Sequence, residues 1–191
     1  YPEREGMACN LVAVEIRECN ARIYHVGDSR AWHIRGERVS CLTRDHTALE
    51  TMIRAGEVDA DDARDYASVY GQLANYFMAS PFEPTPAHDT SALTLDAGDQ
   101  LLLASDGVSV LDSDAISQNV GNDSRATLAA LFDASVAAGS DDNISMILVR
   151  LSGKVMTRRL SQQPPTLSPL TFYSRALRGF PEQSRSVQRA L

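Results

Sequence analysis

Apolar runs rich in Val and Ile alternate with short polar segments near the start of the chain. The runs 11–16 and 21–26 flank a polar segment, and the runs 31–34 and 38–42 flank a loop that contains Gly36. Short runs of this composition are typical of strands, and a glycine supplies the positive φ that a tight hairpin loop needs. The pattern therefore predicts two consecutive β-hairpins.

The periodicity then changes to that of a helix. Thr47 and Glu50 have the spacing of a capping box, and Gly56 is expected to end the helix that they begin. Residues 59–78 predict a further helical stretch, in one piece or two. Its apolar face would hold Val69, Leu73, Tyr76 and Phe77. The three prolines within 80–90 predict a loop.

Strand patterns return in the second half of the chain. Residues 91–95 and 100–104, joined by the turn 96–99, predict another hairpin, and 143–151 predicts a final apolar strand. A helix is expected from Ser124. Its inward residues would be Leu128, Leu131, Phe132 and Val136, with Gly139 as the C-cap. The order of strands, helices and strands predicts an α+β fold in which antiparallel sheets carry helices on their outer faces.

The net charge of −7 over 191 residues is distributed unevenly. Residues 1–151 hold 11 Arg against 24 Asp and Glu, a net −13, whereas residues 152–191 hold 7 Lys and Arg against Glu182 alone, a net +6. The second segment is also rich in Pro, Ser and Gln. A domain boundary is therefore expected near Ser152, followed by a basic, disordered tail. A short basic amphipathic helix over 170–178, facing a partner or a membrane surface, is the alternative for part of this tail.

Composition also excludes several classes of protein. No stretch approaches 18 uninterrupted apolar residues, so no membrane span is expected, and the acidic balance argues against a nucleic-acid partner. Cys9, Cys19 and Cys41 are odd in number and lack metal-binding spacing, which predicts buried, reduced cysteines in a cytoplasmic protein. Because Tyr1 is not an initiator Met, we expect the sequence to begin inside a longer product or after processing.

Three aspartates stand where predicted strands end or begin. Asp28 follows Val26 and Gly27, Asp106 follows the run 100–104, and Asp142 comes just before the last strand. A carboxylate at a strand end is held rigidly but is open to solvent, and the neighbouring glycine leaves room for an ion and its waters. Oxygen ligands without paired His or Cys favour Mg²⁺ or Mn²⁺ over Zn²⁺. The three aspartates are therefore candidate metal ligands.

An ordinary turn is the competing interpretation of each aspartate. Asp-Gly and Gly-Asp are common in turns, so the spacing alone leaves both interpretations open. Other aspartates are assigned to local structure: Asp96 and Asp99 to a hairpin turn, and Asp112 and Asp114 to the start of a helix.

Four motifs occur in a specific order along residues 26–145. They are Val26-Gly27-Asp28-Ser29-Arg30-Ala31-Trp32, Leu42-Thr43-Arg44-Asp45-His46-Thr47, Leu101-Leu102-Leu103-Ala104-Ser105-Asp106-Gly107-Val108 and Asp141-Asp142-Asn143-Ile144-Ser145. Together they resemble the metal-dependent protein phosphatases of the 2C type. The segment 6–13 is also similar to a strand of that family, with Cys9 and Asn10 in place of two threonines. The resemblance covers about residues 6–151.

The resemblance implies a fold, a cofactor and a site. The fold would be a sandwich of two antiparallel β-sheets flanked by helices, in the order α-β-β-α. It would hold two or three Mn²⁺ or Mg²⁺ ions that activate a water against phosphoserine or phosphothreonine. By motif, Asp106 and Asp142 would be ligands of the binuclear core site, and Asp28, with Asp106, a ligand of a third ion. We expect Ser29 and Arg30 to lock the turn that aims Asp28 rather than to bind phosphate.

The sequence also departs from the family pattern. It contains no Asp-Gly-x-Gly-Gly motif, whose aspartate would bridge the two core metals, so the N-terminal part of the domain is expected to be missing. The segment 47–86 corresponds to the variable flap of the family and lacks its frequent Arg-Asn and Leu-Gly pattern. The leading hypothesis is a serine/threonine protein phosphatase that acts on a phosphoprotein and opposes a Ser/Thr kinase. The alternative is a non-catalytic, phosphatase-like binding module or an inactive fragment.

Overall fold

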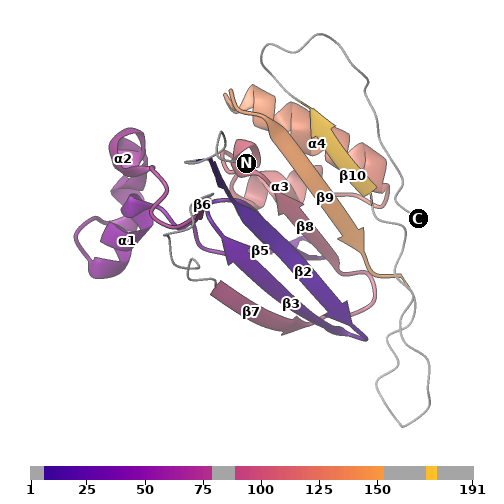
Figure 1. Ribbon diagram of the computed structural model, residues 1–191. Coiled ribbons are helices and arrows are strands. Elements are labelled where there is room, and N and C mark those ends of the chain that lie inside the picture. Colours follow the sequence, from indigo (N-terminus) through magenta and orange to yellow (C-terminus); the bar gives the residue numbers. More distant parts are fainter. Residues whose placement is uncertain (1–6, 79–88, 153–170, 176–191) are drawn as a thin grey trace.

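Two antiparallel β-sheets pack face to face in the computed structural model, which describes residues 7–78, 89–152 and 171–175 (Figure 1). The three-stranded sheet has the order β2 (Leu11–Arg17), β3 (Asn20–Val26), β7 (Asp89–Thr94). The five-stranded sheet has the order β10 (Thr171–Arg175), β9 (Ile144–Arg150), β8 (Gln100–Ala104), β4 (Arg30–Arg35), β5 (Arg38–Cys41). A separate pair joins β1 (Ala8–Cys9) to β6 (Phe77–Met78).

The helices lie in two places. The helices α3 (Ser113–Asn119) and α4 (Ser124–Ala137) pack on the five-stranded sheet, through β5 and β9 respectively. The helix α1 (Ala48–Ala55), the short 3-10 turn η2 (Ala60–Asp62) and the helix α2 (Ala63–Tyr70) form a lobe at one side of the sandwich. A second 3-10 turn, η3 (Asp106–Val108), follows β8 directly. The predicted sandwich of two antiparallel sheets with flanking helices is confirmed.

The strand β8 shows how the core is built on both faces of the larger sheet. Its residues alternate in direction, so Leu102 and Ala104 pack against the helices while Leu101 and Leu103 face the three-stranded sheet. All five residues of β8 are buried. A strand buried on both faces needs a continuous apolar run, which is what the sequence provides here.

The first two predicted hairpins are present, but the third is not. The strands β2 and β3 pair directly, as do β4 and β5. By contrast β7 pairs with β3 in one sheet, whereas β8 pairs with β4 in the other. The turn 96–99 therefore carries the chain between the two sheets. Both strands have apolar residues to bury, and this arrangement places them in opposite layers of the core instead of side by side.

The predicted helix over 59–78 ends much earlier, at Tyr70. Gly71 follows, and the next residues turn to other partners: Ala48 N–H donates to Gln72 O (3.1 Å), and Ala74 N–H donates to His46 O (2.8 Å). The expected apolar stripe is therefore wrong, because its last three members lie beyond the helix. Backbone pairing with a distant segment overrides the helical spacing of this stretch.

The caps and inward faces of the other helices follow the sequence more closely. Thr47 caps α1 by accepting from Glu50 N–H, and Gly56 ends it with φ of 73°. Asp112 likewise caps α3. In α4 the predicted inward residues are buried except Val136, which is 42% exposed. Ser135 occupies the inward position instead and donates its hydroxyl to Leu131 O at 2.8 Å.

Two expectations about the ends of the chain and its cysteines change. Within the expected tail, Thr171–Arg175 forms β10 on the edge of β9 rather than an amphipathic helix. The remaining tail residues lie outside the described residues, so the domain boundary near Ser152 stays a prediction. All three cysteines are free as expected, but Cys9 and Cys41 are exposed rather than buried. None of the described helices is long and apolar enough to cross a membrane.

Asp99 has a role beyond the turn that the sequence predicts. It closes the turn through its N–H to Asp96 O (3.1 Å), yet its side chain is buried against β4. Its carboxylate accepts from Arg35 Nη2 at 2.6 Å and lies 2.9 Å from His33 Nε2. Although burial alone would raise it, the hydrogen bonds from Arg35 and the Asp96 N–H hold the pKa of Asp99 below its usual value. The charged form therefore stabilises the fold, and this contribution is lost as the pH falls through the lowered pKa.

We expect Asp99→Asn to lower the free energy of unfolding at pH 7 by about 2 kcal/mol, because the Arg35 guanidinium loses its buried carboxylate. The matched control is Asp96→Asn, whose side chain is 60% exposed and also contacts Arg35. Exposed ion pairs contribute little, so the control should change stability by less than about 0.5 kcal/mol. Urea denaturation of the two variants measures both values, and equal effects would contradict this assignment.

Candidate metal centre

The three candidate aspartates lie at one end of the five-stranded sheet. In the register of the sheet, Arg30 pairs with Ala104, and Ala104 pairs with Met146. The start of β4, the end of β8 and the start of β9 are therefore neighbours. Asp28 comes just before β4, Asp106 just after β8, and Asp142 just before β9. Pairing of the strands thus brings together three positions that are distant in sequence.

Ser105 fastens the end of β8 to the start of β9. Its hydroxyl donates to Asn143 O at 3.0 Å and accepts from Ser145 N–H at 3.0 Å. The backbone adds a third bond, from Ser105 N–H to Ser145 O at 3.0 Å. These three bonds form a clasp of Ser105, Asn143 and Ser145. Asp106 is next to Ser105 and Asp142 is next to Asn143, so the clasp holds the backbones of the two aspartates in a fixed relation.

Gly107 allows these two segments to approach closely. A Cβ at this position would lie 2.8 Å from Asn143 O and 2.9 Å from Ile144 Cγ1, which is too close for either atom. Glycine is therefore required here for packing of backbone against backbone. The expectation that this glycine leaves room for an ion is wrong, because Asn143 and Ile144 fill the space.

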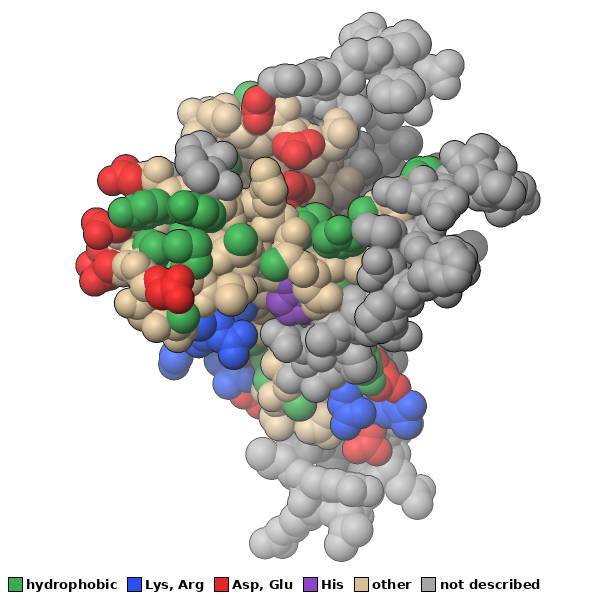
Figure 2. All heavy atoms as spheres, turned by 60° about the vertical axis from the view of Figure 1, so that its left-hand side comes forward, with side chains coloured by type: hydrophobic (Ala, Val, Ile, Leu, Met, Phe, Trp, Pro, Cys, Tyr) green, Lys and Arg blue, Asp and Glu red, His purple; other side chains and the backbone are tan. Residues whose placement is uncertain are grey.

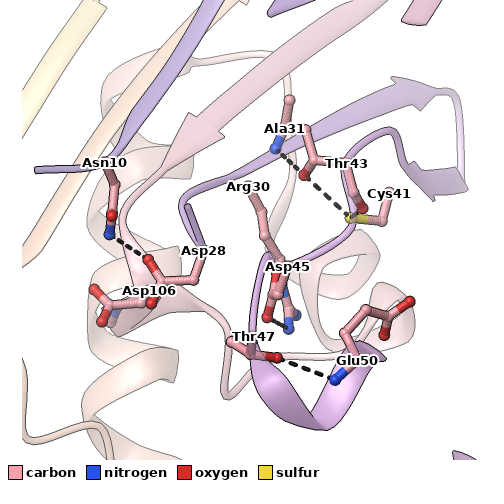
Figure 3. A network of polar contacts seen from close by, with 11 residues as sticks. Asn10, Asp28, Arg30, Ala31, Cys41, Thr43, Asp45, Thr47, Glu50 and Asp106 are labelled. Carbon is pink, nitrogen blue, oxygen red and sulfur yellow. Dashed lines mark hydrogen bonds and ion pairs between the residues drawn. The ribbon is translucent and has the colours of Figure 1, made fainter. Parts of the chain in front are cut away.

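Asp28 is held by Asn10, a residue of the β1–β2 connection. The Asn10 side-chain N–H donates to Asp28 Oδ1, and the two residues face each other beside Asp106 in Figure 3. Gly27, just before Asp28, has φ of 107°, and a Cβ there would lie 2.5 Å from Asn10 Cγ. This glycine thus makes room for Asn10, not for an ion, and Asn10 in turn orients the carboxylate.

The carboxylates interact electrostatically. Burial and the neighbouring charge of Asp142 raise the pKa of Asp106. Burial and the charge of Asp106 likewise raise the pKa of Asp28. Asp142 itself is exposed. Like charges held together by the fold destabilise one another, and a divalent cation between them would remove that penalty.

This charge repulsion has a measurable consequence in the metal-free protein. A raised pKa means that the folded state binds the proton of Asp106 more tightly than the unfolded chain does. The resulting penalty is fully present above the raised pKa and disappears as the pH falls toward about 4, the ordinary pKa of Asp. We therefore expect Asp106→Asn to be more stable than the wild type at pH 7 in the presence of a chelator, with a difference that shrinks at pH 4. Urea denaturation at both pH values measures it, and a less stable variant at pH 7 would contradict the repulsion.

Arg30 is committed to a structural ion pair. Its Nε and Nη2 donate to the two oxygens of Asp45, each at 2.7 Å, in a side-by-side pair (Figure 3). Such a bidentate pair fixes the planes of both groups. It ties the start of β4, two residues after Asp28, to the loop after β5. The expected structural role of Arg30 agrees with this contact.

The donor set fits a divalent cation in its chemistry but is incomplete. Three coupled carboxylates offer the oxygen ligands that Mg²⁺ and Mn²⁺ bind. Within residues 7–78, 89–152 and 171–175, however, no group of three or more His, Cys, Asp or Glu side chains could hold a metal ion. The described aspartates alone therefore do not make a complete metal site, and metal binding by them stays a prediction.

Sequence reasoning missed two residues that position Asp28. Asn10 departs from the family pattern, and this departure was the only signal that it had a role of its own. His46 accepts a hydrogen bond from Gly27 N–H through Nδ1 at 3.2 Å, yet its motif indicated no such contact. Both contacts join segments distant in sequence, which local patterns do not encode.

Comparison with known proteins gives this arrangement a family context. The chain is 30% identical over 153 residues to protein phosphatase PhpP of Streptococcus pneumoniae, covering 77% of the chain and 59% of the relative. It is 29% identical over 157 residues to the serine/threonine phosphatase stp of Listeria innocua, covering 78% and 60%. The chain is homologous to the 2C-type protein phosphatases. It spans about three fifths of the length of these relatives. No family model matches it.

Solved structures of 2C-type phosphatases share this fold. The Mycobacterium tuberculosis serine/threonine phosphatase PstP/Ppp superposes with a TM-score of 0.71 at 23% identity, covering 80% of this chain and 63% of that one. The catalytic domain of PstP in complex with two manganese ions superposes with a TM-score of 0.62 at 23% identity, covering 77% and 60%. The sandwich of this chain is therefore the fold of 2C-type phosphatases.

The helical lobe lies within the segment 47–86, which the resemblance predicts to be a variable flap. Figure 2 views the side of the molecule that carries α1 and α2, where acidic and hydrophobic side chains lie next to each other. Tyr66 and Tyr70 are exposed on α2, with their ring centroids 6.3 Å apart, and Asp61 and Asp62 of η2 are exposed nearby in the chain. The lobe thus offers an acidic, aromatic surface.

Proposed function

We propose that the protein containing this chain is a metal-dependent serine/threonine protein phosphatase. The observation that supports this most is the convergence of Asp28, Asp106 and Asp142 at one end of the five-stranded sheet, in a homologue of 2C-type phosphatases. Burial raises the pKa of both Asp106 and Asp28. The charge of Asp142 raises the pKa of Asp106 further, and the charge of Asp106 raises that of Asp28 further. Perturbed carboxylates gathered at one place are the usual mark of a functional site.

Each aspartate would have a distinct part in holding the ions. Asp106 and Asp142 would bind the core pair, and Asp28 would share a third ion with Asp106. Divalent ions held there would lower the pKa of a bound water and stabilise the charge on the phosphoryl oxygens of the substrate. The clasp of Ser105 keeps Asp106 and Asp142 in register, and Asn10 fixes the direction of Asp28.

The chain's own arginine near the site would not bind the phosphate. Both oxygens of Asp45 already engage the guanidinium of Arg30, and moving it would leave that carboxylate half-buried without its partner. We therefore infer that phosphate binding depends on residues other than Arg30.

The cofactor and partners follow from the same proposal. Mn²⁺ or Mg²⁺ would serve, in two or three copies, and the manganese in the PstP catalytic domain supports the first of these. The substrate would be a protein carrying phosphoserine or phosphothreonine, placed there by a Ser/Thr kinase in the cytoplasm. Three free cysteines among the described residues agree with a reducing compartment.

The direct test is hydrolysis of phosphopeptides by the protein encoded by the complete reading frame. With Mn²⁺ present, we expect release of inorganic phosphate from phosphoserine and phosphothreonine peptides, and none after treatment with a chelator. Binding of a phosphopeptide without release of phosphate, at any Mn²⁺ or Mg²⁺ concentration, would favour the non-catalytic binding module and overturn the proposal.

A further inference from the structure

His46 lies where three segments of the chain meet. Its backbone N–H donates to Gly27 O at 2.8 Å, and its ring Nδ1 accepts from Gly27 N–H at 3.2 Å. On its other side, its carbonyl accepts from Ala74 N–H at 2.8 Å, and Nδ1 lies 2.9 Å from the side-chain Nδ2 of Asn75. One residue therefore contacts both the turn before Asp28 and the segment that follows α2.

The contact with Gly27 fixes the state of the ring. A backbone N–H can only donate, so Nδ1 must present a lone pair and the ring proton must be on Nε2. The ring also packs against the buried ring of His25, with centroids 4.7 Å apart. Its rotation is therefore restricted from two sides.

The neighbours of His46 are fixed as well. Asp45, before it, is held by the bidentate pair with Arg30, and Thr47, after it, caps α1 and bridges to Leu73. The peptide of His46 cannot shift without disturbing both. It is a rigid element between the sandwich and the helical lobe.

Gly27 is the position at which this rigidity matters. Its φ of 107° is a conformation that only glycine adopts readily, and both its N–H and its carbonyl bind His46. Two bonds to one residue set the orientation of the Gly27 peptide units, and the next residue is Asp28. The direction of the Asp28 carboxylate thus depends on His46 as well as on Asn10.

We propose that His46 is a positioning residue that couples segment 72–75 to the metal ligand Asp28. The coupling runs from Ala74 and Asn75 through His46 to Gly27, and it uses only contacts within 3.2 Å. It rests on the proposed function, because it gives the lobe a route to the ion that Asp28 binds. Linkage is reciprocal, so binding of that ion restrains segment 72–75, and displacement of this segment weakens binding of the ion.

The first test uses the full-length protein with His46 unchanged. Amide hydrogen exchange is measured with a chelator and with saturating Mn²⁺. We expect Mn²⁺ to slow the exchange of the Gly27 and Ala74 amides, and Asp28→Asn to abolish the change at Ala74. Slower exchange at Gly27 without any change at Ala74 would overturn the coupling. This measurement needs no variant of His46, so it remains decisive if such a variant folds poorly.

The second test compares two substitutions of His46. His46→Leu removes the acceptor, and we expect the Mn²⁺ concentration for half-saturation of the weakest site to rise about tenfold, the size of effect typical of residues that support a metal ligand. His46→Asn places an oxygen where Nδ1 stands, and it should restore the affinity to within about threefold of the wild type. Calorimetric titration with Mn²⁺ measures all three proteins.

A matched control separates positioning from general stability. His33→Leu removes a histidine that contacts Asp99, toward the opposite end of β4 from Asp28. It should lower stability yet leave Mn²⁺ affinity unchanged. A folded His46→Leu with wild-type Mn²⁺ affinity would overturn the inference alone, whereas a wild type that binds no Mn²⁺ would overturn the proposed function and the inference together.

Discussion

Asp106→Asn is expected to slow Mn²⁺-dependent hydrolysis of a phosphoserine peptide about a thousandfold, which corresponds to about 4 kcal/mol of lost transition-state stabilisation. Asp106 interacts with both other aspartates: after burial, which raises the pKa of both Asp106 and Asp28 most, the charge of Asp142 raises the pKa of Asp106 and the charge of Asp106 raises that of Asp28. A neutral amide at this position would weaken the binding of every ion in the proposed site. Steady-state release of phosphate, measured at several Mn²⁺ concentrations, provides the rate.

The control for this prediction is Asp133→Asn. Asp133 is an exposed aspartate of α4, so its replacement makes the same chemical change away from the candidate site. It should retain the wild-type rate. An Asp106→Asn protein that keeps more than a tenth of the wild-type rate would contradict the role of Asp106 as a shared ligand.

Gly27→Ala is expected to lower the free energy of unfolding by about 3 kcal/mol. The new methyl group meets two obstacles, a backbone φ of 107° and the side chain of Asn10 at 2.5 Å. To avoid either obstacle the backbone around residue 27 must shift, and this shift moves the turn that orients Asp28. The variant should therefore also bind Mn²⁺ more weakly. Urea denaturation gives the stability, and the titration with Mn²⁺ gives the affinity.

Gly121→Ala is the matched control, because its Cβ would have its nearest neighbour at 3.9 Å. It should change stability by less than about 1 kcal/mol. The double variant Asn10→Gly with Gly27→Ala removes the contact and keeps the strained φ, so it should recover part of the loss. A Gly27→Ala protein as stable as Gly121→Ala would show that the close approach of Asn10 is not a constraint.

The sequence alone was sufficient for the local elements that have a clear period or cap. The apolar run 100–104 is β8 to the residue, and Thr47 and Gly56 bound α1 as expected. The three candidate aspartates do fall at neighbouring strand ends. The sequence could predict this because each stands just before or just after an apolar run, and such a run marks the length of a strand. Whether they bind metal stays a prediction.

The features that sequence reasoning missed depend on pairing between distant segments. The run 91–95 looks like the partner of 100–104, but its hydrogen bonds go to β3 in the other sheet. Residues 72–75 have helical spacing, but their backbone binds His46 and Ala48 instead. Likewise the sequence predicts Gly27 and Gly107 as glycines of a turn or an ion site. In the structure each instead makes room for a distant residue, Asn10 beside Gly27 and Asn143 beside Gly107. Tertiary contacts decide between local alternatives that cost similar free energies.

The central claim is that Asp28, Asp106 and Asp142 belong to one divalent-cation site. Calorimetric titration of the full-length protein with Mn²⁺ tests it most directly, with Asp142→Asn and Asp133→Asn titrated alongside. We expect at least two ions to bind the wild type and Asp133→Asn, and at least one fewer to bind Asp142→Asn. Equal stoichiometry and affinity in all three proteins, or no binding to the wild type, would contradict the site.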